Sequence, residues 1–284
     1  MDRAALYRLL DGYLAALAAR DPGQLAWAES VRHSENNVML EPGDGVWATI
    51  TGIGDYHLRF ADPLTRQVGC FGTIIEPMEE SAYCLRIGAD AEGRIAEVEM
   101  VIVRDSEYGM ALPGKRFWAK PRLETNAAAP VSREELLRLA DGYFSTLQLN
   151  DGTIRTKFAP DCNRVENGVQ STNNPELKLF HWAAMGCEEQ FALGIYRYDD
   201  RLRGRRFPLV DEERGLVFAF GFIDHSGRLG RYQLADGSWN ESPIRRPHSF
   251  YLGELFKIDH GMIEQIEADF ISVPYHMPSP WDAA

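Results

Sequence analysis

The sequence has few cysteines, no long apolar run and no excess of positive charge. Its four cysteines, Cys70, Cys84, Cys162 and Cys187, form no CxxC or Cys/His spacing. Four in 284 residues are too few for a disulfide framework, so we interpret them as buried free thiols in a reducing cytoplasm. The formal net charge of −12 disfavours nucleic-acid phosphates and anionic membrane surfaces as partners. No stretch approaches the ~20 apolar residues of a membrane span.

Several signatures of enzyme classes are also missing. No GxSxG, Walker or GxGxxG phrase occurs, so hydrolase, phosphoryl-transfer and dinucleotide-binding interpretations have no support. The seven histidines show no HxH, HxxxH or HExxH pattern, and we therefore predict no metal site. The N-terminal residues 1–20 are rich in Ala and Leu but carry charges at helical spacing. We interpret them as an amphipathic helix of the mature fold and not as a signal peptide.

What the sequence does contain is a repeat. Leu10–Asp21 aligns with Ala140–Asp151 without a gap, and Glu35-Asn36 aligns with Glu166-Asn167 after a one-residue shift. Two later pairs of phrases follow in the same order: Val68–Glu76 with Leu216–Asp224, and Gly93–Val103 with Gly261–Val273. This order predicts a tandem duplication with domains at 1–105 and 132–284, joined by a linker at 106–131.

Each half has the same predicted order of elements, helices first and strands afterwards. In the second half, Ser132 and Glu135 form a capping box that predicts a helix start. A second helix is expected over Pro175–Leu193, followed by strands at Arg205–Val210, Gly215–Ile223, His248–Ile258 and Met262–Val273. This order predicts an α+β fold in which a curled antiparallel sheet, with helices across its concave side, forms a cone around an apolar pocket.

Each half resembles the NTF2-like superfamily, in its SnoaL-like and ketosteroid-isomerase-like branch. The resemblance is carried by Tyr13, Asp21 and the phrase "SENN" in the first copy, and by Tyr143, Asp151 and "VENG" in the second. It implies two cone-shaped α+β barrel domains in tandem and cofactor-independent proton-transfer chemistry. It also implies that the halves pack back to back as a pseudo-dimer within one chain, with further homo-oligomerisation left open.

The resemblance also suggests site residues. It places Tyr143 and its twin Tyr13 where the family's oxyanion-hole tyrosine lies, and Glu166 and Glu35 at or within one residue of the family's base. The chain departs from the family pattern here, because the residue is Glu instead of Asp and Asn follows where Pro is common. In the alternative interpretation the tyrosines are core residues and the Glu-Asn pair makes turn hydrogen bonds. Asn167 is a further candidate, as a donor to a substrate oxygen.

Histidines and arginines supply further candidates. His181 lies in an apolar segment, and His248 shares a strand face with Phe250; both are candidate acid–base residues, with packed core histidines as the alternative. His33 alternates with Glu35 and completes a secondary site in the first half. Arg164 and Arg206 are candidate clamps for a substrate oxygen, against the alternative of solvated surface charges.

The largest difference between the copies is an insertion at residues 225–248 of the second half. It carries Tyr232 and Trp239, and an insertion of this length often serves as a lid or an interface arm. Tyr232 and Trp239 are therefore candidate substrate-binding residues. We place the main site in the second half.

Two functional hypotheses follow. The first is a cytoplasmic, cofactor-independent lyase or isomerase that acts on a small apolar molecule, aromatic or polycyclic, by dehydration, isomerisation or retro-aldol cleavage. Glu166 or a histidine would abstract a proton, and Tyr143 and Asn167 would hold the oxygen. The second is a non-catalytic small-molecule-binding or dimerisation module. An epoxide hydrolase would need a buried Asp–Arg–Asp arrangement, which the sequence does not place.

Overall fold

The computed structural model describes residues 1–104, 121–178 and 181–282. Here we call residues 1–104 the first half and 121–282 the second half. The elements of the first half are α1 (Arg3–Ala18), η1 (Pro22–Gln24), β1 (Trp27–Glu35), β2 (Val38–Met39), α2 (Val46–Thr49), β3 (Gly52–Asp62), β4 (Gln67–Ile75), β5 (Glu80–Ala89) and β6 (Ile95–Val103).

The second half begins inside the predicted linker, whose residues 106–120 lie outside the described part. Its elements are α3 (Pro121–Glu124), α4 (Arg133–Leu147), β7 (Phe158–Glu166), β8 (Val169–Gln170), η3 (His181–Ala184), α5 (Cys187–Leu193), β9 (Arg201–Asp211), β10 (Leu216–His225), β11 (Arg231–Gln233), β12 (Trp239–Glu241), β13 (His248–Asp259) and β14 (Met262–Val273).

The fold is α+β, with two six-stranded sheets of the same strand order. The first sheet runs β2-β1-β6-β5-β4-β3, and the second runs β8-β7-β14-β13-β10-β9. Both are mixed sheets, because β1 pairs parallel with β6 and β7 pairs parallel with β14. The expectation of purely antiparallel sheets was therefore wrong. No hairpin joins β1 to β6 or β7 to β14, so turn geometry does not force these pairs to run antiparallel.

The sequence patterns locate α4 and four strands of the second half, β9, β10, β13 and β14, within a few residues. The Ser132 hydroxyl accepts a hydrogen bond from the Glu135 backbone N–H at 3.3 Å, and α4 begins at Arg133 as the capping box predicts. The helix expected over Pro175–Leu193 is wrong: the described residues there hold the short η3 and α5, separated by Gly186. Gly186 adopts an extended backbone as the N-cap of α5, and this ends the preceding turn.

The Glu-Asn phrase of each half is the corner of a tight hairpin. Asn36 and Asn37 lie between β1 and β2 with φ of 51° and 67°, and Asn167 and Gly168 lie between β7 and β8 with φ of 49° and 80°. A two-residue turn with both φ values positive matches the twist of the flanking strands and favours Asn and Gly.

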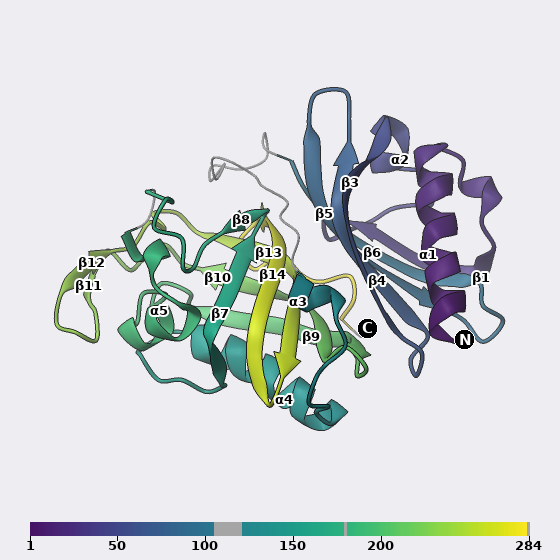
Figure 1. Ribbon diagram of the computed structural model, residues 1–284. Helices are drawn as coiled ribbons and strands as arrows, with labels where there is room; N and C mark the ends of the chain where they lie inside the picture. Colours follow the sequence, from purple (N-terminus) through teal and green to yellow (C-terminus); the bar gives the residue numbers. More distant parts are fainter. Residues whose placement is uncertain (105–120, 179–180, 283–284) are drawn as a thin grey trace.

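Each sheet buries one face against its own helix. In the first half, Leu6, Leu10 and Tyr13 of α1 enter a core with the sheet, and α1 lies on the side of that sheet away from the second half (Figure 1). In the second half, α4 and α5 pack in the same way on the second sheet. No helix in the described residues is long and apolar enough to cross a membrane. All four cysteines are buried and free, as expected.

The other faces of the two sheets pack against each other. Their shared core includes Phe60 and Phe71 of the first sheet and Phe218 and Tyr251 of the second. Phe218 lies edge-on to Phe60 with ring centroids 5.3 Å apart. Apolar burial of this kind supplies most of the free energy that holds two sheets together.

Ion pairs at the edge of this contact are reciprocal. Arg3, at the start of α1, binds Asp211 with Nη2···Oδ1 at 2.8 Å, and Arg133, at the start of α4, binds Asp62. Asp211 also accepts the Ala61 N–H at 3.1 Å, and Asp62 accepts the Val210 N–H at the same distance. Each half therefore gives the other the same pair of contacts.

The segment after β14 crosses from the second half to the first. The Trp281 indole N–H donates to Ser34 Oγ at 3.0 Å, and Arg32 and Asn37 donate to the carbonyl oxygens of Pro280 and Pro278 at 2.7 and 2.9 Å. Trp281 is buried there, with the Arg32 guanidinium 4.4 Å from its ring centroid.

Candidate functional site

The concave side of the second sheet encloses a cavity of about 110 Å³. Its walls are mainly aromatic and aliphatic. The residues that the argument below uses from its lining are Tyr143, Arg164, Glu166, Asp199, His225 and Glu254. Pro243 and Ile244 of the insertion also border the cavity, while the small β11–β12 hairpin stands apart from both sheets (Figure 1).

Glu254 is a carboxyl group deep in this cavity. It lies on β13 between Leu252 and Phe256, on the strand face that looks toward α4, and is 3% exposed. The pKa of Glu254 is raised to about 8, mainly by burial and also by the Glu166 carboxylate, while Arg164 and a hydrogen bond with Tyr143 oppose the shift. The group is therefore mainly a neutral carboxylic acid near pH 7.

Tyr143 supports this acid from α4. Its side chain is buried, with its ring edge-on to Phe256 and Phe191 at centroid distances of 5.0 and 5.3 Å. Burial holds the pKa of its hydroxyl well above the usual value, so it stays a neutral donor. Tyr143 and Glu254 thus place two neutral O–H groups in one apolar cavity.

Arg164 and Glu166 form the polar wall on β7. Arg164 is 2% exposed; its Nη2 donates to Gln190 Oε1 at 2.7 Å and its Nε lies 3.3 Å from Glu166 Oε2. It also donates to the Tyr196 hydroxyl. The Glu166 side chain is 26% exposed and borders the cavity. Because a buried guanidinium needs its partners, the network fixes the position of Glu166.

Asp199 and His225 meet at another part of the wall. His225 Nε2 lies 2.9 Å from Asp199 Oδ1, and both side chains are buried. The His225 ring stacks on His248 at a centroid distance of 4.7 Å and lies edge-on to Phe250 at 4.8 Å.

Other candidates named from the sequence do not line this cavity. The Asn167 amide both donates to and accepts from the backbone of Phe270, at 3.2 and 2.9 Å, so it joins the corner of the β7–β8 hairpin to β14. His181 is exposed, and its neighbour Trp182 lines the cavity instead. His248 contacts His225 but does not border the cavity in the described residues.

Three substrate-binding candidates have other contacts. Arg206 lies between the two sheets and donates to Glu99 Oε2 at 3.1 Å, because its strand turns it away from the concave side. Tyr232 is buried, and its hydroxyl donates to the Ile195 carbonyl oxygen. Trp239 is 57% exposed on β12. None of the three lines the described cavity.

The first-half candidates lie in a more filled environment. Glu35 accepts the Val46 N–H at 2.7 Å and binds Arg104 at 3.1 Å, so its carboxylate anchors α2 and pairs with an arginine. Tyr13 is buried against Trp47, with ring centroids 5.5 Å apart. Burial lowers the pKa of His33 to about 4, so that this histidine is neutral near pH 7.

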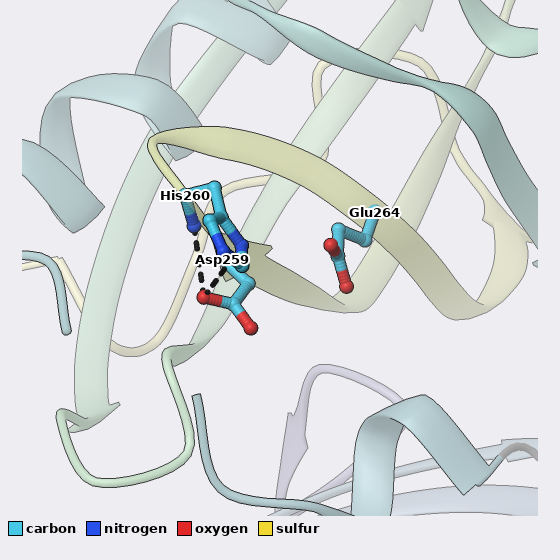
Figure 2. Close-up of side chains that lie close together, drawn as sticks. All are labelled: Asp259, His260 and Glu264. Carbon is cyan, nitrogen blue, oxygen red and sulfur yellow. Dashed lines mark hydrogen bonds and ion pairs between the residues drawn. The ribbon is translucent and has the colours of Figure 1, made fainter. Parts of the chain in front are cut away.

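Three side chains of metal-ligating types lie together at the turn between β13 and β14. Asp259, His260 and Glu264 place ligand atoms within 4.8 Å of one another (Figure 2). The two Asp259 oxygens already accept the N–H groups of Ala128 and Ala129 at 2.7 and 2.8 Å. We therefore interpret this group as an anchor for the segment that precedes α4.

Comparison with known families gives a match in the second half. Residues 129–270 match the family model described as "Domain of unknown function (DUF8021)". The chain belongs to the DUF8021 family. The matched range includes α4 and all the cavity residues described above. No curated protein matches the chain.

Solved structures similar to this DUF8021 protein have low scores. One is a protein from Sphaerobacter thermophilus, with 17% identity over 34% of this chain and 94% of that chain, at a TM-score of 0.26. Another is described as a putative isomerase of the SnoaL-like family from Agrobacterium tumefaciens str. C58, with 17% identity over 36% and 99%, at 0.27. A de novo designed protein with a curved β-sheet has 13% identity over 49% and 87%, at 0.28. Scores of this size carry no functional argument.

The sequence interpretation did not name Glu254, Asp199 and His225, which line the cavity in the DUF8021 segment. Glu254 had a usable signal, because it is a single acid on an apolar strand face, at even spacing from Phe250 and Leu252. Asp199 had no such signal in the sequence, since it lies in a loop among polar residues. Only the fold brings it close to His225.

Proposed function

We propose that the second half is a cofactor-independent proton-transfer enzyme, a lyase or isomerase, for a small apolar and aromatic carbonyl compound. The observation that carries this proposal is the buried, neutral Glu254 acid beside Tyr143 in an apolar cavity. A neutral carboxylic acid and a tyrosine hydroxyl are the donors that stabilise an enolate oxygen as charge develops on it.

Glu166 is the base in this proposal. It borders the same cavity, and Arg164 holds it in place while its side chain stays partly accessible. A substrate with its carbonyl oxygen at Tyr143 and Glu254 would lose a proton from the adjacent carbon to Glu166. Trp182, Phe250 and Phe270 would pack on its apolar part.

We also propose that the chain is a tandem duplication whose halves form a pseudo-dimer. The shared strand order and the reciprocal pairs Arg3–Asp211 and Arg133–Asp62 support it. Contacts that repeat with the partners exchanged are the mark of a two-fold interface.

The test is hydrogen exchange at carbon in heavy water, with benzylacetone as the probe. We expect the wild-type protein to accelerate deuterium uptake beside the ketone. Tyr143→Phe should reduce the rate by about 10²-fold or more, as for the loss of one oxyanion donor. Glu166→Gln should reduce it by at least about 10²-fold, as for the loss of a general base. Glu134→Gln, at an exposed position in α4, is the matched control. Uptake at the buffer rate, or full activity of both site variants, would refute the proposal.

A further inference from the structure

The cavity contains a second titratable pair that the proposed proton abstraction does not use. Asp199 lies in the loop before β9, and His225 is the last residue of β10. Asp199 is 4% exposed and His225 is 1% exposed, yet both border the cavity. Keeping two titratable side chains in an apolar wall is costly unless they are paired, and His225 Nε2 is paired with Asp199 at 2.9 Å.

The pairing leaves one ring nitrogen of His225 without a partner. Nδ1 is buried and has no hydrogen bond among the described residues. Leaving a buried polar atom without a hydrogen bond is unfavourable, and native proteins keep few such atoms. A carboxylate on one imidazole nitrogen with the other nitrogen free is also the arrangement that orients a histidine for proton transfer.

The pair is close to the proposed catalytic groups. Burial raises the pKa of Asp199, the His225 hydrogen bond opposes this, and the Glu166 carboxylate raises it further, which places Glu166 within electrostatic reach. The apolar surface between them is continuous: the Phe250 ring contacts His225 at a centroid distance of 4.8 Å and Phe270 at 4.9 Å. Phe270 is in turn bonded through its backbone to Asn167, next to Glu166.

An isomerisation needs one base and one oxyanion site, because the same proton leaves one carbon and returns to another. A separate acid–base pair on another part of the wall has a role when a leaving group must be protonated. This inference rests on the proposed function and narrows it: we infer that His225, oriented by Asp199, protonates the leaving hydroxyl of a β-hydroxy carbonyl substrate. The reaction is then a β-elimination of water.

The β-elimination moves one proton to Glu166 and one from His225. Glu166 takes a proton from the carbon beside the carbonyl, and Tyr143 and Glu254 hold the enolate oxygen. The electron pair of the enolate forms the new C=C bond as the C–O bond at the β-carbon breaks. The leaving oxygen takes a proton from Nδ1 of the His225 imidazolium, and water departs. Solvent then removes the proton from Glu166 and returns one to His225. Asp199 is a positioning residue, since it acts through the imidazole.

The experiment uses the aldol adduct of benzaldehyde and acetone in heavy water and follows two signals. Deuterium uptake beside the ketone reports proton abstraction, and benzylideneacetone reports elimination. We expect both from the wild-type protein. His225→Phe should keep uptake within about three-fold while elimination falls by about 10²-fold, and Asp199→Asn should lower elimination by at least ten-fold with uptake kept. His57→Phe, an exposed histidine of the first half, is the control.

The outcomes separate the two proposals. Uptake without elimination in the wild-type protein overturns this inference and leaves the proposed function standing. If the wild-type protein gives neither deuterium uptake nor elimination, both this inference and the proposed function are overturned. Equal loss of both signals in His225→Phe, or benzaldehyde and acetone as products, also overturns the inference. A second measurement on the intact protein covers a variant that fails to fold: nitrogen-15 NMR of the histidine rings should show the His225 Nδ1 resonance shift on addition of the adduct. An unchanged resonance overturns the inference.

Discussion

The two halves share a strand order but differ in one row of side chains across their concave faces. Strand pairing places four positions of each sheet side by side: Glu166, Ala268, Glu254 and Ala219 in the second half, and Glu35, Met100, Leu85 and Cys70 in the first. The second row alternates acids with alanines, and three of its members, Glu166, Ala268 and Glu254, line the cavity. The first row keeps one acid and replaces the rest with larger or apolar side chains. Met100 and Leu85 are 2% and 0% exposed.

This difference changes the size and charge of the side chains on one sheet face while the strand order stays the same. Alanine at 268 leaves space, and an acid at 254 places chemistry beside it. In the first half, Met100 and Leu85 occupy the corresponding positions, and Arg104 binds Glu35. The two halves thus share their strand order and their hairpin corners, while a few positions differ in size and charge between the two faces.

The largest expected effect is the pH dependence that Glu254 gives to the free energy of unfolding. A folded pKa of about 8 against an ordinary value of 4.5 means that the folded state keeps a proton that the unfolded state has lost. Stability should therefore fall as pH rises from about 4.5 to 8, by at most about 5 kcal/mol at ~1.4 kcal/mol per pH unit. Urea unfolding across this range measures it. Glu254→Gln should remove the decline, whereas Glu134→Gln should keep it; a decline of the same size in Glu254→Gln would contradict our view of this residue.

The next effect tests the packing of the two rows. Met100→Ala should lower the free energy of unfolding by about 2–5 kcal/mol, because it leaves a cavity in the filled half. The reverse change, Ala268→Met, enters existing space, and should cost less than about 2 kcal/mol while it blocks deuterium uptake by benzylacetone. Urea unfolding and the exchange assay measure the two quantities. Similar costs for both changes would mean that the two concave faces are equally packed.

A smaller effect tests the symmetry of the contact between the halves. Asp62→Asn and Asp211→Asn each weaken hydrogen bonds from an arginine and a backbone N–H of the other half. Each should cost about 2 kcal/mol, and the two costs should agree within about 0.5 kcal/mol. Asp236→Asn, at an exposed loop position, should be neutral. Strongly unequal costs in thermal or urea unfolding would argue against a two-fold contact.

The smallest effect concerns the paired hairpin corners. Asn36→Ala and Asn167→Ala should each cost about 1–2 kcal/mol, because alanine tolerates a positive φ less well and loses the bonds to Ile102 or Phe270. Denaturation midpoints of the two variants should shift together. If only the second-half variant also lost proton exchange, the Asn167 amide would have a role beyond the turn.

Alternation and capping were enough to predict α4 and four strands of the second half, β9, β10, β13 and β14. Ser132 with Glu135 located the start of α4. The parallel pairing of β7 with β14 could not be predicted, because no local sequence pattern links strands separated by about a hundred residues. The helix over 175–193 failed because an apolar stretch cannot by itself be told from irregular chain that packs on a core.

Three residues named from the sequence, Tyr143, Glu166 and Arg164, line one cavity of the second half. The Asp199–His225 pair could not be predicted, since its members are 26 residues apart and only the return of β10 beside the loop before β9 joins them. Arg206 could not be oriented, because which face of β9 meets the other sheet depends on the packing of the halves.

The Trp281 contact has a consequence for the order of events during synthesis. Ser34 and Trp281 are 247 positions apart, so the ribosome must add nearly the whole described chain before the indole can reach its partner. Until then Ser34 lacks that hydrogen bond, and the Arg32 guanidinium lacks its contact with the indole ring of Trp281. The first half can form its sheet early, but its contact with Trp281 forms only after the second half has been synthesised.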